Sequence, residues 1–156
     1  MLRTHGHVVH SFDLIDYRSP DQDSGGRDFL LERKLPPGTE GIVTNPPYAL
    51  ANEFVAHAIA LCPLVIMLLR LAFLESTRRT RILEHANLAR VYVFRNRLPA
   101  MHRDGWAGPK VSTATAYAWF VWDRRHTGPT ELRRLSWERH DHASISLPRI
   151  SPQFEP

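Results

Sequence analysis

The sequence predicts an α/β fold built on one mostly parallel sheet. Two continuous apolar runs, at residues 64–69 and 88–94, have the length and composition of buried strands. Segments with helical spacing precede each run, and Gly and Pro residues mark the boundaries. Alternating strands and helices are typical of βαβ units. With 156 residues, 43% of them hydrophobic, the chain is long enough for one domain with its own core.

The first half of the chain is expected to contain two strands. Residues 7–15 are predicted as the first strand, with Asp13 near its carboxyl end, and a polar loop with two glycines follows at residues 17–27. The second strand, residues 41–44, is expected to be buried and to run directly into Asn45-Pro46-Pro47-Tyr48.

The second half is expected to supply two helices and three strands. Residues 49–61 have helical spacing and end before Pro63. The apolar run 64–69 predicts a parallel strand covered by helices on both faces. A second helix is predicted at 70–86, followed by strands at 88–94 and 116–122. Right-handed crossovers would then place Asn45 and Asp13 on one edge of the sheet.

Charge and composition favour a nucleic-acid partner and a reducing compartment. The net charge is +4, the pI is about 9.7, and 18 of the 20 cations are arginine, the residue best suited to phosphate and bases. Arg-rich composition is also common on ordinary solvated surfaces. The single cysteine, Cys62, excludes an internal disulfide. We find no signal peptide and no apolar run long enough for a bilayer, so we expect a cytoplasmic protein without membrane contacts. The histidines form no metal-binding pattern.

The predicted nucleic-acid contacts are basic and aromatic residues in two segments. The long segment 95–113 interleaves arginines with a tryptophan, a combination that suits phosphate and base contacts, although a plain surface loop fits as well. Two arginines of the predicted helix 70–86 are further candidates. The candidates are Arg78, Arg79, Arg95, Arg97, Arg103, Trp106 and Lys110.

The segment from Asn45 to Tyr48 has the residue types needed to hold an amino group. Two prolines keep Asn45 extended and leave carbonyl acceptors with few local donors. The Asn45 side-chain oxygen and the Pro46 carbonyl can accept two N–H bonds from an amino group conjugated to a ring. This would favour a pyramidal nitrogen with a free lone pair. Tyr48 offers a flat face for a planar substrate.

Asn-Pro-Pro-Tyr after an apolar strand resembles the catalytic motif of the S-adenosylmethionine-dependent amino-methyltransferases, above all the DNA adenine-N6 enzymes. The resemblance implies a Rossmann-like class I methyltransferase fold with a terminal antiparallel hairpin, which residues 116–122 would complete. It implies catalytic roles for Asn45, Pro46, Pro47 and Tyr48. It also implies that Asp13 binds the cofactor ribose, and that Asp28 and Phe29 bind its adenine. An N-cap aspartate before a buried phenylalanine explains Asp28 and Phe29 equally well.

The sequence departs from this family at the cofactor motif. The first strand and the glycine-rich turn that let the backbone approach the methionine part of the cofactor are missing, and Gly25-Gly26 lies elsewhere. We therefore expect a partial methyltransferase domain at residues 1–140 and a loosely packed tail at 141–156. A late start of the reading frame, a second chain or homodimer partner that completes the sheet, and a degenerate protein are all compatible with this pattern.

The leading hypothesis is a methyltransferase that acts on an exocyclic amino group of DNA, first of all adenine N6, and that is incomplete or inactive as this chain. Cytosine N4, RNA and protein glutamine remain open as targets. The competing hypothesis is a non-catalytic remnant that binds DNA or a partner subunit. We further expect this chain alone to bind S-adenosylmethionine weakly or not at all.

Overall fold

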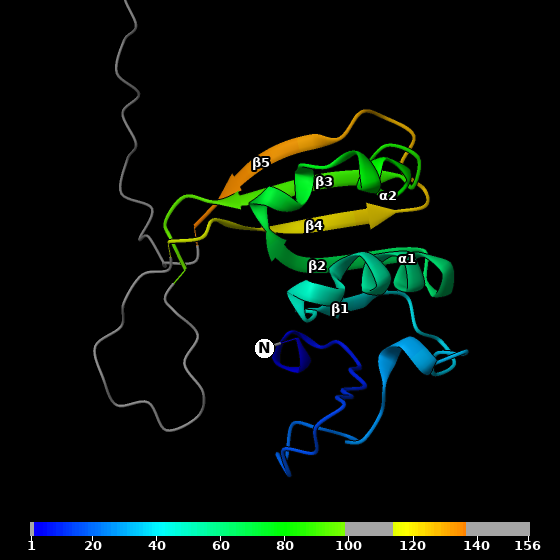
Figure 1. Ribbon diagram of the computed structural model, residues 1–156. Helices are drawn as coiled ribbons and strands as arrows, with labels where there is room; N and C mark the ends of the chain where they lie inside the picture. Colours follow the sequence, from blue (N-terminus) through cyan, green and yellow to red (C-terminus); the bar gives the residue numbers. More distant parts are fainter. Residues whose placement is uncertain (1, 99–113, 137–156) are drawn as a thin grey trace, which may run out of the picture.

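The computed structural model describes residues 2–98 and 114–136, which form one open five-stranded sheet with helices packed against it (Figure 1). The strand order is β1-β2-β4-β3-β5. Four strands point the same way, because β1 pairs parallel with β2 and β3 pairs parallel with β5, whereas β4 runs antiparallel to both of its neighbours. The strands are β1 Ile42–Thr44, β2 Leu64–Arg70, β3 Leu88–Phe94, β4 Tyr117–Asp123 and β5 Glu131–Leu135.

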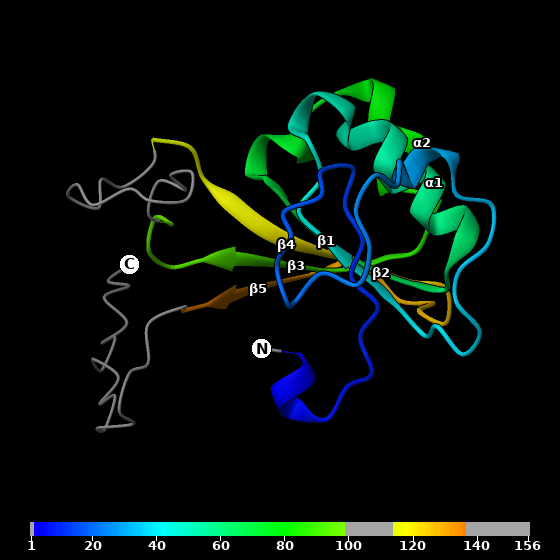
Figure 2. The ribbon, with the colours of Figure 1, turned by 90° about the horizontal axis from the view of Figure 1, so that it is seen from below.

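Both α-helices lie over the same face of the sheet (Figure 2). Helix α1 (Ala51–Leu61) connects β1 to β2, and α2 (Thr80–Leu83) precedes β3. The chain thus advances across the sheet in one direction, and successive right-handed crossovers that advance in one direction place their helices on one side. The expectation of helices on both faces of the strand at 64–69 is therefore wrong for the described part of the chain.

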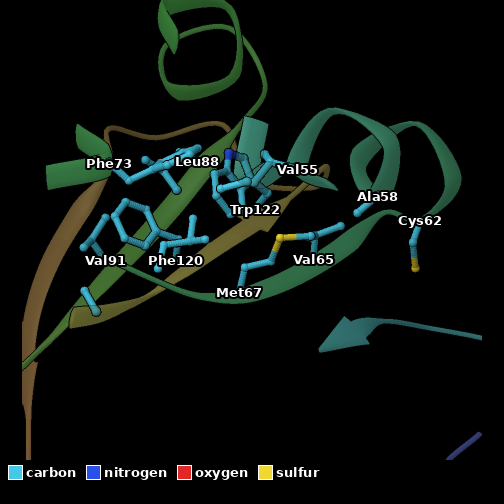
Figure 3. Packing of buried hydrophobic residues seen from close by; sticks show 13 residues of the cluster. Val55, Ala58, Cys62, Val65, Met67, Phe73, Leu88, Val91, Phe120 and Trp122 are labelled. Atoms are coloured by element: carbon cyan, nitrogen blue, oxygen red, sulfur yellow. The ribbon is translucent and has the colours of Figure 1, made fainter. Parts of the chain in front are cut away.

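The core lies between α1 and the inner face of the sheet (Figure 3). Val65 and Met67 of β2 point toward α1, as the period of two in a strand requires, and Phe120 and Trp122 of β4 extend the same layer. Trp122 is 2% exposed, and its indole N–H donates a hydrogen bond of 2.7 Å to the Ile82 carbonyl of α2. This bond fixes α2 against the sheet.

Four predicted elements are confirmed with small changes at their ends. The strands expected at 64–69, 88–94 and 116–122 are β2, β3 and β4, and the helix expected at 49–61 is α1, preceded by a short 3-10 turn η3 (Tyr48–Leu50). The pairing of β3 with β4 supplies the expected antiparallel hairpin, but β4 sits inside the sheet, between β2 and β3. The predicted boundary at residue 140 lies outside the described residues.

The strand predicted at residues 7–15 does not form. This segment has one isolated bridge, between Phe12 and Ser24. Val8 and Leu14 are 89% and 64% exposed. A strand needs a hydrogen-bonded neighbour as well as a suitable composition, and here the segment folds back on residues 21–27. The N-terminal segment lies on the β1 side of the sheet (Figure 1).

The helix predicted at residues 70–86 is broken into three short pieces. These are the 3-10 turns η4 (Leu71–Leu74) and η5 (Thr77–Arg79), followed by α2. Ser76 stands at the break with a φ of 108°, which an α-helix does not allow, and its hydroxyl accepts a bond from the Arg78 amide. The local side-chain bond of Ser76 competes with the helical pattern.

The two edge strands differ most from expectation. Strand β1 was predicted to be buried, but it forms one edge of the sheet, and Val43 is 46% exposed. Strand β5, at the other edge, is a polar segment that the sequence does not mark as a strand, and Leu132 is 67% exposed. Edge strands bury little side-chain surface, so their sequences carry little of the pattern that predicts strands.

Candidate functional site

The candidate site lies at the end of the sheet formed by the carboxyl ends of β1 and β2. Strand β4 begins at this same edge because it runs antiparallel: Tyr117, its first residue, pairs with Arg70, the last residue of β2. Thr44, the last residue of β1, pairs with Met67, so Asn45 emerges at this edge as well. Ligands of open α/β sheets bind outside the carboxyl ends of the parallel strands.

The loop after β1 is held firmly and presents one polar side chain to solvent. Pro46 is buried, whereas Asn45 and Pro47 are exposed. The Pro47 carbonyl accepts a bond of 2.9 Å from the Leu50 amide, which closes the turn that leads into α1. Because both prolines also have restricted φ angles, the position of Asn45 is set by covalent geometry and packing together.

Tyr48 forms the inner wall of the site. Its ring centroid is 5.5 Å from that of Tyr117, and the Arg70 guanidinium carbon is 5.0 Å from the same Tyr48 centroid. Burial and a hydrogen bond with Tyr117 raise the pKa of Tyr48 from 10.0 to about 12, against the opposing effects of Arg70 and Asn45. The phenol therefore stays neutral at physiological pH.

Asn45 keeps an acceptor available for a ligand. Its side chain hydrogen-bonds to Tyr48, and this bond acts to lower the pKa of the phenol. Asn45 is exposed, and its side-chain amide offers an acceptor, Oδ1, as well as N–H donors.

A cavity of about 190 Å³ opens beside Tyr48, lined by Ala51, Leu69, Arg70, Phe73 and Arg79. Its two arginines are in different situations. Arg79 donates to the carbonyls of Ala72, Phe73 and Glu75 and to the Asn52 side chain, so it holds η4 against α1. Arg70 is exposed and forms no salt bridge with any residue that the structure describes.

The predicted ribose ligand Asp13 lies in the N-terminal segment, not at the end of a strand. Its carboxylate accepts a bond of 2.9 Å from the Ile15 amide, and its backbone bonds to Ser24 and Arg27. It lines an open hollow of about 390 Å³ together with Phe12, Tyr17 and other residues of this segment. None of the hydrogen bonds seen for Asp13 in the described chain reaches Asn45.

Asp28 caps a short helix and Phe29 packs against the core, which are the structural roles given above as the alternative to cofactor binding. Asp28 caps the short 3-10 helix η2 (Phe29–Leu31) by accepting a bond of 2.9 Å from the Leu30 amide. The Phe29 ring packs on Phe54 and edge-on against His57, with centroids 5.2 and 5.1 Å apart. These contacts leave the predicted adenine-binding roles untested.

The described residues do not complete a site for S-adenosylmethionine. One carboxylate oxygen of Asp13 and one of Asp28 already accept backbone amides. Gly25 serves local packing, because a Cβ added there would lie 2.4 Å from the Asp16 Cα atom. No glycine-rich turn follows a strand in the part of the chain that the structure describes. We therefore derive no reaction step that depends on the cofactor.

The predicted nucleic-acid residues are only partly described. Arg95 and Arg97 are exposed just after β3, at the same sheet edge as Asn45, and Arg78 is exposed in η5. Arg79 is half-buried and bonded as above. The predicted contacts Arg103, Trp106 and Lys110 lie outside the described residues.

Sequence analysis missed Arg70 and Tyr117 as site residues. Both have a signal that was present in the sequence: each stands at the end of an apolar strand, on the edge that carries Asn45. For Arg70, the rule that ligands bind at the carboxyl ends of parallel strands is sufficient. Tyr117 is at this edge only because β4 is antiparallel, so the strand direction had to be known first.

Comparison with known proteins gave no matching family model and no matching curated protein. Among the described residues, no helix has the length and apolar character needed to cross a membrane. The described residues also contain no group of three or more His, Cys, Asp or Glu side chains arranged for a metal ion.

Proposed function

We propose that this chain is the target-binding part of an S-adenosylmethionine-dependent methyltransferase that acts on an exocyclic amino group of DNA, namely adenine N6. The observation that carries the proposal is the placement of Asn45. Asn45 is exposed at the end of β1, is followed by two prolines, and its side chain hydrogen-bonds to Tyr48. Rigid placement of a residue that binds the reacting group can lower the barrier of a group transfer.

In this proposal, Asn45 and Pro46 bind the two hydrogens of the amino group. The acceptors are Asn45 Oδ1 and the Pro46 carbonyl oxygen. Two hydrogen bonds directed at a conjugated amine favour a pyramidal nitrogen, whose lone pair is then no longer delocalised into the ring and is available as a nucleophile. Tyr48 supplies a flat ring for a flipped base, and the cavity of about 190 Å³ beside it has room for part of that base.

The test measures recognition of the amino hydrogens without any cofactor. A single-stranded oligonucleotide with one adenine is compared with the same strand bearing N6,N6-dimethyladenine, which has no N–H donors. We expect the protein to prefer adenine about tenfold, because two neutral hydrogen bonds contribute roughly this much. Asn45→Ala should abolish the preference, and Asn45→Asp, which keeps an acceptor oxygen at this position, should retain part of it.

The controls separate folding from recognition. Asn45 is exposed, so Asn45→Ala should change the free energy of unfolding by less than about 0.5 kcal/mol. Equal binding of the two oligonucleotides by the wild type would contradict the proposal. A preference for cytosine over its N4-dimethyl form, or for RNA over DNA, would support binding of an amino group at Asn45 but show that adenine in DNA is not the target.

A second candidate function is a non-catalytic protein that binds DNA or a partner subunit through the same edge. The use of Asp13 and Asp28 as local backbone acceptors favours this candidate. The exposed edge strand β1, with Val43 46% exposed, leaves room for a second chain or a homodimer partner that adds a strand.

Calorimetric titration of S-adenosylmethionine into the 156-residue chain, with Asp13→Ala as control, distinguishes the two candidates. We expect weak binding or none from the chain alone. Cofactor binding that Asp13→Ala abolishes and that strengthens DNA binding would favour the enzyme. DNA binding that ignores the cofactor would favour the non-catalytic protein.

A further inference from the structure

The cavity beside Tyr48 has an unusual balance of charge. Its lining includes two arginines and no acidic residue. Because Tyr48 is neutral below about pH 12, no phenolate compensates the arginines either. An uncompensated positive charge beside an apolar wall attracts anions more strongly than one in open solvent.

The two arginines differ in how many of their donors the protein already uses. Arg79 spends its Nε and Nη1 donors on protein acceptors, and its guanidinium lies 4.4 Å from the Phe73 ring centroid. The Arg70 guanidinium lies 5.0 Å from the Tyr48 ring centroid, and its N–H donors make no hydrogen bond with the residues that the structure describes. A guanidinium held over a ring can still bind an oxyanion bidentately through its edge.

Arg70 lies close to the loop from Asn45 to Tyr48, which is proposed to bind the amino group. Thr44 pairs with Met67, so Asn45 lies one strand away from Arg70 and two or three residues short of it along the strand direction. Strand spacing and rise place the two backbones on the order of 8 Å apart. A single nucleotide can therefore contact both residues, with its base at Asn45 and a phosphate at Arg70.

We propose that Arg70, at the mouth of the Tyr48 cavity, binds an oxyanion, and that this oxyanion is a phosphate of the polynucleotide whose base enters the site. The proposal rests on the function proposed above and adds the residue that positions the strand. The same oxyanion chemistry is offered by the carboxylate of an amino-acid cofactor, so the test includes both ligands.

The experiment measures binding of a fluorescent single-stranded oligonucleotide by anisotropy over a series of salt concentrations. Loss of one phosphate contact should reduce the slope of log affinity against log salt by about 0.7 for single strands. We expect Arg70→Gln to show this reduction and to lower affinity at least several-fold. Arg70→Lys keeps the charge, so it should keep the slope while losing part of the affinity.

The matched control is Arg33→Gln. Arg33 is exposed and precedes β1, whose start lies at the opposite edge of the sheet. Equal effects of Arg70→Gln and Arg33→Gln on slope and affinity would overturn the proposal, as would a wild type that does not bind the oligonucleotide. Thermal unfolding of each variant checks that the fold is kept, and Arg70→Lys remains informative if Arg70→Gln is unstable.

Two further arms separate this proposal from the proposed function. If Arg70→Gln weakens S-adenosylmethionine binding in calorimetry but not oligonucleotide binding, the oxyanion is a carboxylate and the phosphate assignment is wrong. If wild type and Arg70→Gln differ as expected but neither distinguishes adenine from N6,N6-dimethyladenine, the phosphate site stands and the amino-group function fails. If the adenine preference holds and Arg70→Gln leaves the slope unchanged, the amino-group function stands and the phosphate site at Arg70 is wrong.

Discussion

The ring centroid of Tyr117, the first residue of β4, lies 5.5 Å from that of Tyr48. The two tyrosine side chains also hydrogen-bond to each other. The two tyrosines come from segments almost seventy positions apart, and the antiparallel direction of β4 brings them together. Through this contact the central strands of the sheet support the loop that carries Asn45. Four predictions follow from this and neighbouring contacts.

Tyr117→Phe should lower the pKa of Tyr48 below about 12, because a hydrogen bond with Tyr117 contributes to raising it. Burial is the larger cause and persists in the variant, so the pKa should stay above 10. Ultraviolet absorbance of the phenolate during an alkaline titration measures this shift, with Tyr48→Phe identifying the signal. An unchanged titration of Tyr48 in the variant would show that the hydrogen bond with Tyr117 does not contribute to the pKa of Tyr48.

Stability should decrease between about pH 10 and pH 12. The folded state holds the Tyr48 proton up to about pH 12, whereas the unfolded chain releases it near pH 10. In this window the unfolded state binds fewer protons, so the free energy of unfolding falls as pH rises. Urea unfolding at pH 9, 10 and 11 should show the decrease in the wild type, and Tyr48→Phe should show a smaller one.

Arg79→Ala should destabilise the protein by about 2 kcal/mol, the cost of losing several hydrogen bonds to a charged group in a partly exposed setting. The wild-type side chain donates to three carbonyls and to Asn52. Urea denaturation measures the loss. The neighbouring Arg78 is exposed, and Arg78→Ala should change stability by less than about 0.5 kcal/mol. Equal effects of the two variants would contradict the role assigned to Arg79.

Trp122→Phe should cost about 3 kcal/mol, because it leaves a cavity in the core and deprives the Ile82 carbonyl of its indole donor. Trp119, on the other face of β4, is half-buried, so Trp119→Phe should cost clearly less. Chemical denaturation followed by circular dichroism avoids any dependence on tryptophan fluorescence. A larger loss in the Trp119 variant would place the main core on the opposite face of the sheet.

The sequence by itself determined the central elements of this protein. Strands β2, β3 and β4 and helix α1 were predicted because each buries a continuous or periodic apolar surface, and burial leaves a clear pattern in the residue types. The rigid loop from Asn45 to Tyr48 was also predicted, since proline restricts the backbone whatever the surroundings.

Tertiary structure decided what depends on a neighbour. Residues 7–15 have the composition of a strand but pair with residues 23–27 and not with a strand of the sheet, whereas the polar strand β5 formed because β3 offered a partner. The direction of β4 placed Tyr117 and Arg70 side by side at the edge that carries Asn45. Backbone hydrogen bonding across a sheet depends on what lies alongside each strand, and no property of a single segment specifies it.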